Sequence, residues 1–157
     1  MRKKLLYVHH SGLLGGAPKS LTYLVSEVDN EKYEAEILTI RNGPAVELLQ
    51  SSGLPVKIAK FMFPFHGTTV SGMSKKLFIR NLIGAFPTYF MAKRYIKKYK
   101  PQILHLNSTC LFLVAKAAKK VSKDTVVICH VREPLLKGFA GDILKKMNHK
   151  YVDGFIS

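Results

Sequence analysis

Short apolar runs alternate with longer amphipathic stretches along the chain. Five of these runs are typical of buried strands, and a sixth begins near the end of the sequence. The predicted strands are residues 5–8, 36–40, 56–59, 103–106, 125–129 and 154–156. Between them, apolar residues recur at helical spacing. The predicted helices are residues 18–28, 46–49, 75–98, 110–121 and 142–151.

This alternation predicts an α/β fold, a Rossmann-like, doubly wound parallel sheet with helices on both faces. Pro87 lies inside the longest predicted helix, where we expect a kink or a break. Ligands of such sheets bind beyond the carboxyl ends of the strands. The turns that follow the strands are therefore the places to look for a site. They are residues 9–17, 42–44, 61–72, 107–110 and 130–138.

Size and composition predict one domain over residues 1–157, in which 47% hydrophobic residues suffice for a real core. The two cysteines, Cys110 and Cys129, lie beside or inside apolar runs and have no metal-ligand spacing, which favours a reducing, cytoplasmic compartment. The opening segment imitates a signal peptide, but its apolar run ends at His9. These features argue against secreted, fibrous, disulfide-rich and integral-membrane classes.

The formal net charge of +15 is concentrated in one half of the sequence. Residues 48–123 contain no Asp or Glu but hold 14 of the 25 Lys and Arg residues. The rest of the chain carries 11 basic and 10 acidic residues, so it is nearly balanced. Such asymmetry indicates a polyanionic partner: nucleic acid, anionic lipid or a phosphorylated substrate.

The turn over residues 9–17 joins a predicted strand to a predicted helix and contains the adjacent glycines Gly15 and Gly16. A ligand can approach the backbone closely there, and free N–H groups at the start of a helix favour an anion. Neither of the usual nucleotide-binding glycine motifs is present. The glycines therefore either contact a phosphate or only shape a tight turn.

Two later turns also carry polar side chains. His105 lies within an apolar strand, which favours a satisfied core histidine, whereas Asn107 and Ser108 follow that strand and either cap the next helix or bind a sugar hydroxyl. The third turn places His130, Arg132 and Glu133 after another strand. We interpret His130 as functional; Arg132 and Glu133 either act at the site or pair with each other or with neighbours.

Three segments in order carry a family resemblance. They are His9-His10-Ser11 with Gly15-Gly16-Ala17, then residues 101–108 (PQILHLNS), then residues 127–134 (VICHVREP). Together they resemble the amino-terminal half of family-four glycosyltransferases, across essentially all 157 residues. The resemblance implies the two-domain GT-B fold, with an acceptor-side domain first and a nucleotide-sugar domain second.

The resemblance also implies roles for single residues. Gly15 and Gly16 match the glycine-rich loop near the donor diphosphate, and His130 matches a histidine near the donor sugar, which makes it the candidate catalytic residue. Four more residues fall on loops that face the acceptor side. They are Asn107, Ser108, Arg132 and Glu133.

The implied reaction is sugar transfer from a nucleotide sugar to a glycan or lipid-linked acceptor, with retention at the anomeric carbon and with no cofactor or metal. The second domain of the family, with its Glu-x7-Glu motif and diphosphate-binding basic residues, is missing from this sequence. We therefore expect a fragment that transfers nothing alone. The strand just beginning at residues 154–156 supports that expectation over a finished, standalone anion- or nucleotide-binding module.

Residues 73–100 combine eight basic residues with many large apolar ones and no acids. A basic helix with exposed aromatics suits an anionic membrane surface, here through Lys93, Arg94, Lys97 and Lys98. The alternative is a solvated helix with all its aromatics inside. Membrane contact would place the protein peripherally on the inner face of the plasma membrane. Nucleic-acid binding ranks third, because no DNA- or RNA-binding motif is present.

Overall fold

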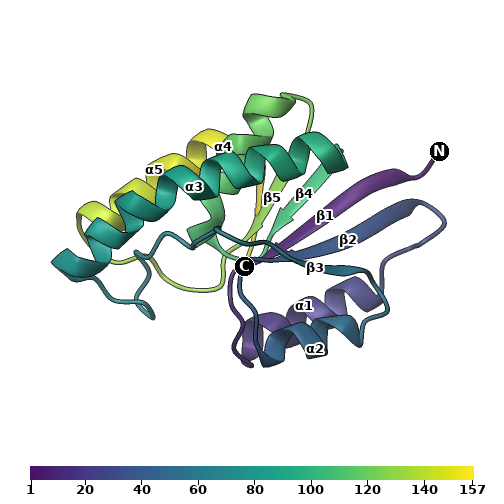
Figure 1. Ribbon diagram of the computed structural model, residues 1–157, viewed down its shortest axis with the longest axis horizontal. Coiled ribbons are helices and arrows are strands. Elements are labelled where there is room, and N and C mark those ends of the chain that lie inside the picture. The colour runs from purple at the N-terminus through teal and green to yellow at the C-terminus, as the bar shows by residue number, and fades with distance from the viewer.

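The computed structural model describes residues 1–157 and confirms the predicted fold class. Its six strands are β1 (Lys3–His9), β2 (Tyr33–Thr39), β3 (Val56–Ile58), β4 (Ile103–Leu106), β5 (Val126–His130) and β6 (Gly154–Ile156). Its helices are α1 (Gly16–Ser26), α2 (Pro44–Gln50), α3 (Lys75–Tyr99), α4 (Phe112–Val121) and α5 (Phe139–Tyr151), with a short 3-10 helix, η1 (Thr109–Leu111), before α4. Helices α1 and α2 cover one face of the sheet, and α3, α4 and α5 lie over the other (Figure 1).

All neighbouring strands are parallel, in the order β3-β2-β1-β4-β5-β6. The direction of winding reverses between β1 and β4. These two strands are paired, and Val8 of β1 lies opposite Leu106 of β4. At such a switch point the connections leaving the two strands run to opposite faces, and a crevice opens between them. His9 ends β1 and Asn107 follows β4, so their two turns flank this crevice.

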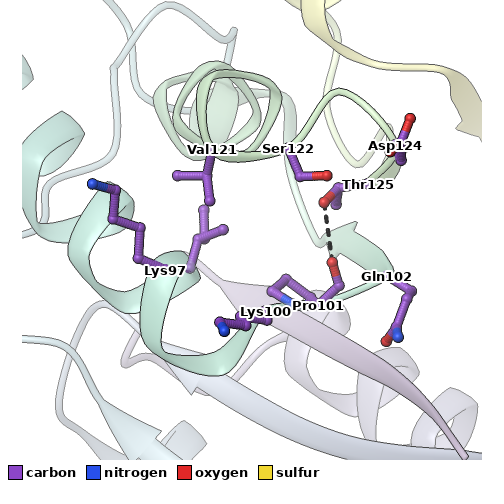
Figure 2. Close-up of a pocket in the computed structure, with 9 residues that line it drawn as sticks. Lys97, Lys100, Pro101, Gln102, Val121, Ser122, Asp124 and Thr125 are labelled. Atoms are coloured by element: carbon purple, nitrogen blue, oxygen red, sulfur yellow. Dashed lines mark hydrogen bonds between the residues drawn. The ribbon is translucent and has the colours of Figure 1, made fainter.

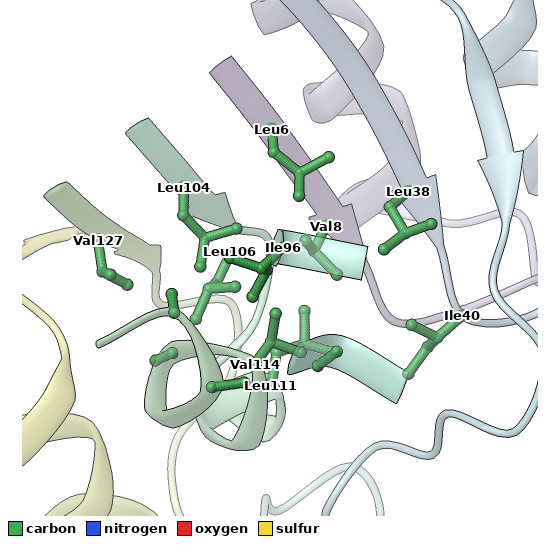
Figure 3. Packing of buried hydrophobic residues seen from close by; sticks show 14 of the residues in the cluster. Leu6, Val8, Leu38, Ile40, Ile96, Leu104, Leu106, Leu111, Val114 and Val127 are labelled. Atoms are coloured by element: carbon green, nitrogen blue, oxygen red, sulfur yellow. The ribbon is translucent and has the colours of Figure 1, made fainter. Parts of the chain in front are cut away.

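Alternation along the strands divides the core into two layers. Leu6 and Val8 of β1 pack with Leu104 and Leu106 of β4 against α3 and α4 (Figure 3). Leu5 and Tyr7 face the other way, toward α1 and α2. Because successive side chains of a strand point to opposite faces, the continuous apolar runs fill both layers. The sheet is therefore buried on both sides where the site is built.

Helix α3 continues through Pro87 as one element of 25 residues, so the expected break does not occur. The Thr88 hydroxyl donates to the Gly84 carbonyl at 2.6 Å and accepts the backbone N–H of Phe63 at 2.8 Å. These bonds tie the middle of the helix to the preceding loop, which helps the helix to tolerate a proline. None of the helices combines the length and hydropathy that crossing a bilayer requires.

Candidate functional site

A hydrogen-bonded network centred on Asn107 joins the turns at the switch point. The Asn107 amide nitrogen lies 2.9 Å from Nδ1 of His9 and donates to the Ala17 carbonyl at 3.1 Å. Its amide oxygen accepts from Nε of Arg132 at 3.1 Å. Arg132 also donates through Nη1 to the Ser20 hydroxyl. One buried side chain thus holds the turns after β1 and β5 and the start of α1 together.

His9 is fully buried beside this network, and its Nε2 has no hydrogen-bond partner. Burial, helped by the charges of His10 and Arg132, lowers its pKa to about 3. The ring is therefore neutral near pH 7. Because the Asn107 oxygen is taken by Arg132, its amide group donates to Nδ1 of His9, which puts the ring proton on Nε2.

The start of α1 is open to an anion. No side chain caps this end, and its first turn carries no acidic residue. Backbone N–H groups at a helix start that lack partners attract negative charge. A Cβ atom added at Gly15 or Gly16 would meet no atom within 4 Å, and Gly15 has extended backbone angles. Neither packing nor backbone conformation requires glycine at these two positions, which leaves room for a ligand against the backbone.

Gly12 and Gly43, in contrast, are required by the fold. Their backbones cross so closely that a Cβ at Gly12 would lie 2.1 Å from the Asn42 carbonyl oxygen. Gly43 has a φ of 148°, a conformation that other residues rarely adopt. The Gly12 carbonyl accepts the N–H of Ala45 at 3.0 Å. This crossing fixes the turn after β1 against the start of α2.

The site itself is an open cleft with two lobes. The first lobe, about 590 Å³, lies along the glycine turn and the start of α1 and reaches Ser20 and Arg132. The second, about 380 Å³, extends toward His66 of the loop after β3 and Arg80 of α3. Five residues line both lobes. They are His10, Ser11, Leu13, Val70 and Glu133.

His10 and Glu133 lie where the two lobes meet. Nε2 of His10 is 3.9 Å from a Glu133 carboxylate oxygen, and its buried Nδ1 has no partner. Burial lowers the pKa of His10; Glu133 opposes this shift, whereas Arg132 and His66 add to it. A neutral imidazole beside a carboxylate can accept a hydrogen bond or a proton from a hydroxyl group.

The structure separates the predicted site residues into two groups. Gly15, Gly16, Arg132 and Glu133 line the cleft, and Arg132 pairs with Asn107 and Ser20 and not with Glu133. Asn107 and Ser108 are buried, with exposed fractions of 0% and 1%, and line neither lobe; of the two roles left open for them, capping is the one that Ser108 fills. The Ser108 hydroxyl accepts the Cys110 N–H at the start of η1.

His130 does not line either lobe. It ends β5 with its ring 6.0 Å from that of His105, and its buried Nδ1 has no partner. Burial, helped by the charge of Arg132, lowers its pKa. The role that the resemblance implies for His130, near a donor sugar, stays a prediction. His105 is 5% exposed beside Tyr7, yet its Nε2 also lacks a partner, so it is a core histidine but not a satisfied one.

Sequence reasoning gave no role to His10, Ser20 or His66. The signal for His10 is its position in the His9-His10-Ser11 segment, two residues after the predicted strand 5–8. Ser20 lies on α1 and is found only through its bond to Arg132, 112 residues away. His66 is placed by Asn81 of α3, which accepts from its backbone N–H and donates to its carbonyl. Neither the Ser20–Arg132 contact nor the Asn81–His66 contact can be predicted from the spacing of residues in the sequence.

Another cavity, about 380 Å³, lies at the opposite edge of the sheet (Figure 2). It is formed where α3 and α4 end and β4 and β5 begin, and the Thr125 hydroxyl donates to the Pro101 carbonyl across it at 3.0 Å. It contains no histidine or unpartnered buried polar atom. Lys97 lines it, and also lines a shallow basic pocket on α3 with Lys93, Arg94 and Lys98.

The fold matches solved GT-B structures. HepE from Anabaena, crystallised with UDP and glucose, superposes with a TM-score of 0.71 at 15% identity, over 99% of this chain and 38% of that one. MurG from Acinetobacter baumannii gives 0.61 at 15% identity, over 98% and 40%. A putative UDP-N-acetylglucosamine 2-epimerase from Listeria monocytogenes gives 0.63 at 12% identity, over 100% and 39%.

No protein-family model matches the chain, and a search of curated proteins finds no match either. The structural likeness is at low identity and therefore defines the fold: one Rossmann-like half of a GT-B protein, as the resemblance implies. The chain spans about 40% of the length of these structures. Because an epimerase shares the fold, activity has to be argued from the site.

Proposed function

We propose that this chain is the N-terminal, acceptor-side half of a retaining glycosyltransferase. The enzyme would move a sugar from a nucleotide-sugar donor to a glycan or lipid-linked acceptor, without a cofactor. One observation carries the proposal: a GT-B half-domain presents, at its switch point, an uncapped helix start and two glycines that its own packing does not require. A second, nucleotide-sugar domain would complete the catalytic site, so the chain alone is expected to transfer nothing.

The first lobe suits the donor diphosphate. Backbone N–H groups at Gly15 and Gly16 would approach the phosphate oxygens, and Arg132 adds a positive charge held in place by Asn107. Fixed donors of this kind stabilise the charge that develops on a departing diphosphate, which is commonly the largest catalytic contribution. UDP in the HepE structure and UDP-sugar chemistry in the name of the Listeria protein both support a nucleotide-sugar ligand.

The second lobe suits the acceptor. His66 and Arg80 offer hydrogen bonds to hydroxyl groups there, while Phe65 and Leu77 provide apolar contacts. His10 lies at the border, where an acceptor hydroxyl would meet the donor sugar. We propose that Nε2 of this neutral imidazole orients that hydroxyl together with the Glu133 carboxylate, which lies 3.9 Å from it. Asn107 acts as a positioning residue through Arg132.

Binding at the first lobe is tested by following the backbone amide signals of the chain by NMR during titration with UDP, UDP-glucose or inorganic diphosphate. We expect shifts at residues 15–17 with all three ligands, and further shifts at His10 only with the nucleotide sugar. Shifts that are identical with inorganic diphosphate would favour a standalone anion-binding module. Binding of random oligonucleotides in preference to UDP would favour the nucleic-acid alternative.

Gly16→Asp separates ligand binding from folding. The new carboxylate has free space and lies in the first turn of α1, where negative charge stabilises a helix, so thermal stability should be kept or slightly raised. It should nevertheless repel a diphosphate and weaken UDP binding by about tenfold or more. Gly16→Asn is the matched neutral control. Equal UDP affinity in the two variants would contradict a phosphate site at this turn.

Transfer and its stereochemistry are tested on the two-domain protein. With a nucleotide sugar and a suitable acceptor, NMR of the product reports the anomeric configuration, for which we expect retention. An inverted product would overturn that part of the proposal and give His10 the role of general base. Conversion of the nucleotide sugar without an acceptor would instead favour an epimerase. Comparison of His10→Gln with His130→Gln shows which imidazole the reaction uses.

A further inference from the structure

Helix α3 has an outer surface unlike that of an ordinary surface helix. Every exposed residue between Lys75 and Tyr99 is either basic or large and apolar, with no acidic or neutral polar residue among them. The buried side is built from small and polar residues: Asn81, Gly84, Thr88 and Ala92, followed by Ile96. A helix packed on a protein core normally has its apolar stripe inside and its polar face outside. Helix α3 makes inward apolar contacts through half-buried residues such as Phe78, Tyr89 and Met91, but it also carries a second set of large apolar residues that face outward.

The exposed apolar residues form one continuous stripe. Ile79, Ile83, Phe86 and Phe90 follow one another at steps of three or four residues, so they lie along one side of the helix, and Leu82 borders them. Their exposed fractions range from 49% for Phe90 to 72% for Phe86. The rings of Phe86 and Phe90 are 4.6 Å apart. A patch of exposed large apolar side chains of this kind indicates a surface that a protein partner or a membrane covers.

Basic residues flank this stripe at both ends. Lys75 and Lys76 precede it, and a shallow pocket of about 530 Å³ follows it, lined by Phe90 and four basic residues of the last turns. A second pocket, about 340 Å³, shares Arg94 and Lys98 with the first and adds Lys4 and Lys57 from the sheet. Lys57 is paired with Glu36, and Lys4 lies 3.9 Å from Glu34. The positive charges left for a phosphate are therefore those of the last turns of α3, around spaces large enough to admit one.

We infer that α3 is a membrane-docking face that lies flat on an anionic lipid bilayer. The stripe enters the boundary between headgroups and acyl chains, and the basic residues around Arg94 and Lys98 bind lipid phosphates. Charge complementarity selects this occupant, because residues 48–123 carry no acidic side chain with which a mixed-charge protein surface could pair. A helix of 25 residues is about 37 Å long and rests on the surface without spanning it.

This docking face adjoins the cleft. Leu77 and Arg80 of α3 line the second lobe, and the exposed stripe begins at Ile79 between them. An acceptor anchored in the bilayer would therefore meet the second lobe at the membrane surface. Only this consequence rests on the proposed transferase; docking itself needs nothing from the sugar site. The anionic inner leaflet of the plasma membrane has the required charge.

The absence of tryptophan from the chain allows a direct test. Phe86→Trp introduces a single tryptophan into the stripe, and Tyr23→Trp introduces one on α1, where Tyr23 is 75% exposed. The probes are vesicles of phosphatidylcholine with or without 30% phosphatidylglycerol. We expect the emission of Phe86→Trp to shift to shorter wavelength with the anionic vesicles, and that of Tyr23→Trp to stay unchanged. Equal responses of the two variants, or none, would overturn the inference.

Two further variants separate the apolar from the charged contribution in co-sedimentation with the same vesicles. Ile83→Ser with Phe86→Ser should abolish binding without changing thermal stability, since both side chains are exposed. Replacing Lys93, Arg94, Lys97 and Lys98 by Gln should weaken binding to anionic vesicles about a hundredfold or more. Gln at Lys3, Lys32, Lys60 and Lys123 removes the same charge elsewhere and should have a much smaller effect.

A competing occupant gives a different result. If α3 instead joined two copies of the chain, Phe86→Trp would show its wavelength shift without vesicles, and the shift would grow with protein concentration. Light scattering would then report a dimer that Ile83→Ser with Phe86→Ser dissociates. Either observation would overturn membrane docking, whatever the outcome of the UDP titrations.

Discussion

Acidification should destabilise this protein through its buried histidines, and His105 allows the effect to be measured. His105 is 5% exposed between Tyr7 and His130, with no partner for its Nε2. Burial, with smaller contributions from His130 and Arg132, lowers its pKa to about 4. The unfolded chain, with an ordinary histidine pKa of about 6.5, therefore binds a proton at pH 5 that the folded chain does not.

The sign and size of the effect follow from this difference. Because the folded pKa is lower than the unfolded one, the free energy of unfolding falls as the pH falls from about 6.5 toward 4. Each pH unit in that range costs about 1.4 kcal/mol per histidine, so His105 contributes a loss of about 2 kcal/mol between pH 7.5 and pH 5. His9, whose pKa lies at about 3, contributes a similar loss over that interval.

The change to test is His105→Leu, which removes the titrating ring and an unpartnered buried nitrogen. Guanidinium unfolding followed by circular dichroism at pH 7.5, 6 and 5 gives the free energy at each pH. Between pH 7.5 and pH 5, the free energy of unfolding should fall by about 2 kcal/mol less in the variant than in wild type. His149→Gln, at an exposed position, is the control and should parallel wild type. A parallel curve for His105→Leu as well would refute the reasoning.

Three further changes test the frame of the site by thermal unfolding. Gly12→Ala should lower stability by about 3 kcal/mol, roughly 10 °C, because its Cβ would lie 2.1 Å from the Asn42 oxygen; Gly15→Ala, with open space, should change little. Asn107→Leu should cost about 3 kcal/mol, because Arg132 and His9 lose partners in the interior, and the same variant should weaken UDP binding in the NMR titration. Asn81→Leu should cost about 2 kcal/mol by releasing the His66 backbone, and cleavage of residues 61–72 by a nonspecific protease should become faster than in wild type.

The order of strands and helices could be predicted from the sequence because each element carries its own period. The runs at residues 5–8 and 103–106 are apolar on both faces, which is how a doubly covered parallel strand appears. Of the kink or break expected at Pro87, the break does not occur, and the reason is tertiary. Thr88 bonds both to the preceding turn and to Phe63, and these contacts hold the helix together at a position where local propensity would end it.

The site could be predicted only in part. Residues of four of the five predicted turns line one cleft, because chain direction alone brings the carboxyl ends of parallel strands to one edge; residues 42–44 do not line it. Which side chains of those turns face the cleft depends on contacts across about a hundred residues. Asn107 is turned inward by His9, 98 residues away, and Arg132 is held by Ser20, 112 residues away. Exposed aromatics on α3 were one of two interpretations of the sequence, but the sequence could not decide between them, because spacing alone does not say which of two apolar faces packs inward.

The close contact between the backbones of Gly12 and Gly43 determines the position of the turn that contains Gly15 and Gly16. A residue that touches no ligand, on the connection between β2 and α2, sets how far the α1 turn can advance toward the cleft. A Cβ methyl group added at Gly12 or at Gly43 would push the two loops apart and displace Gly15 and Gly16. The reach of this turn toward a ligand is therefore decided in part at Gly43, in a separate segment of the chain, and a substitution at one of these two positions cannot be compensated by a substitution at the other.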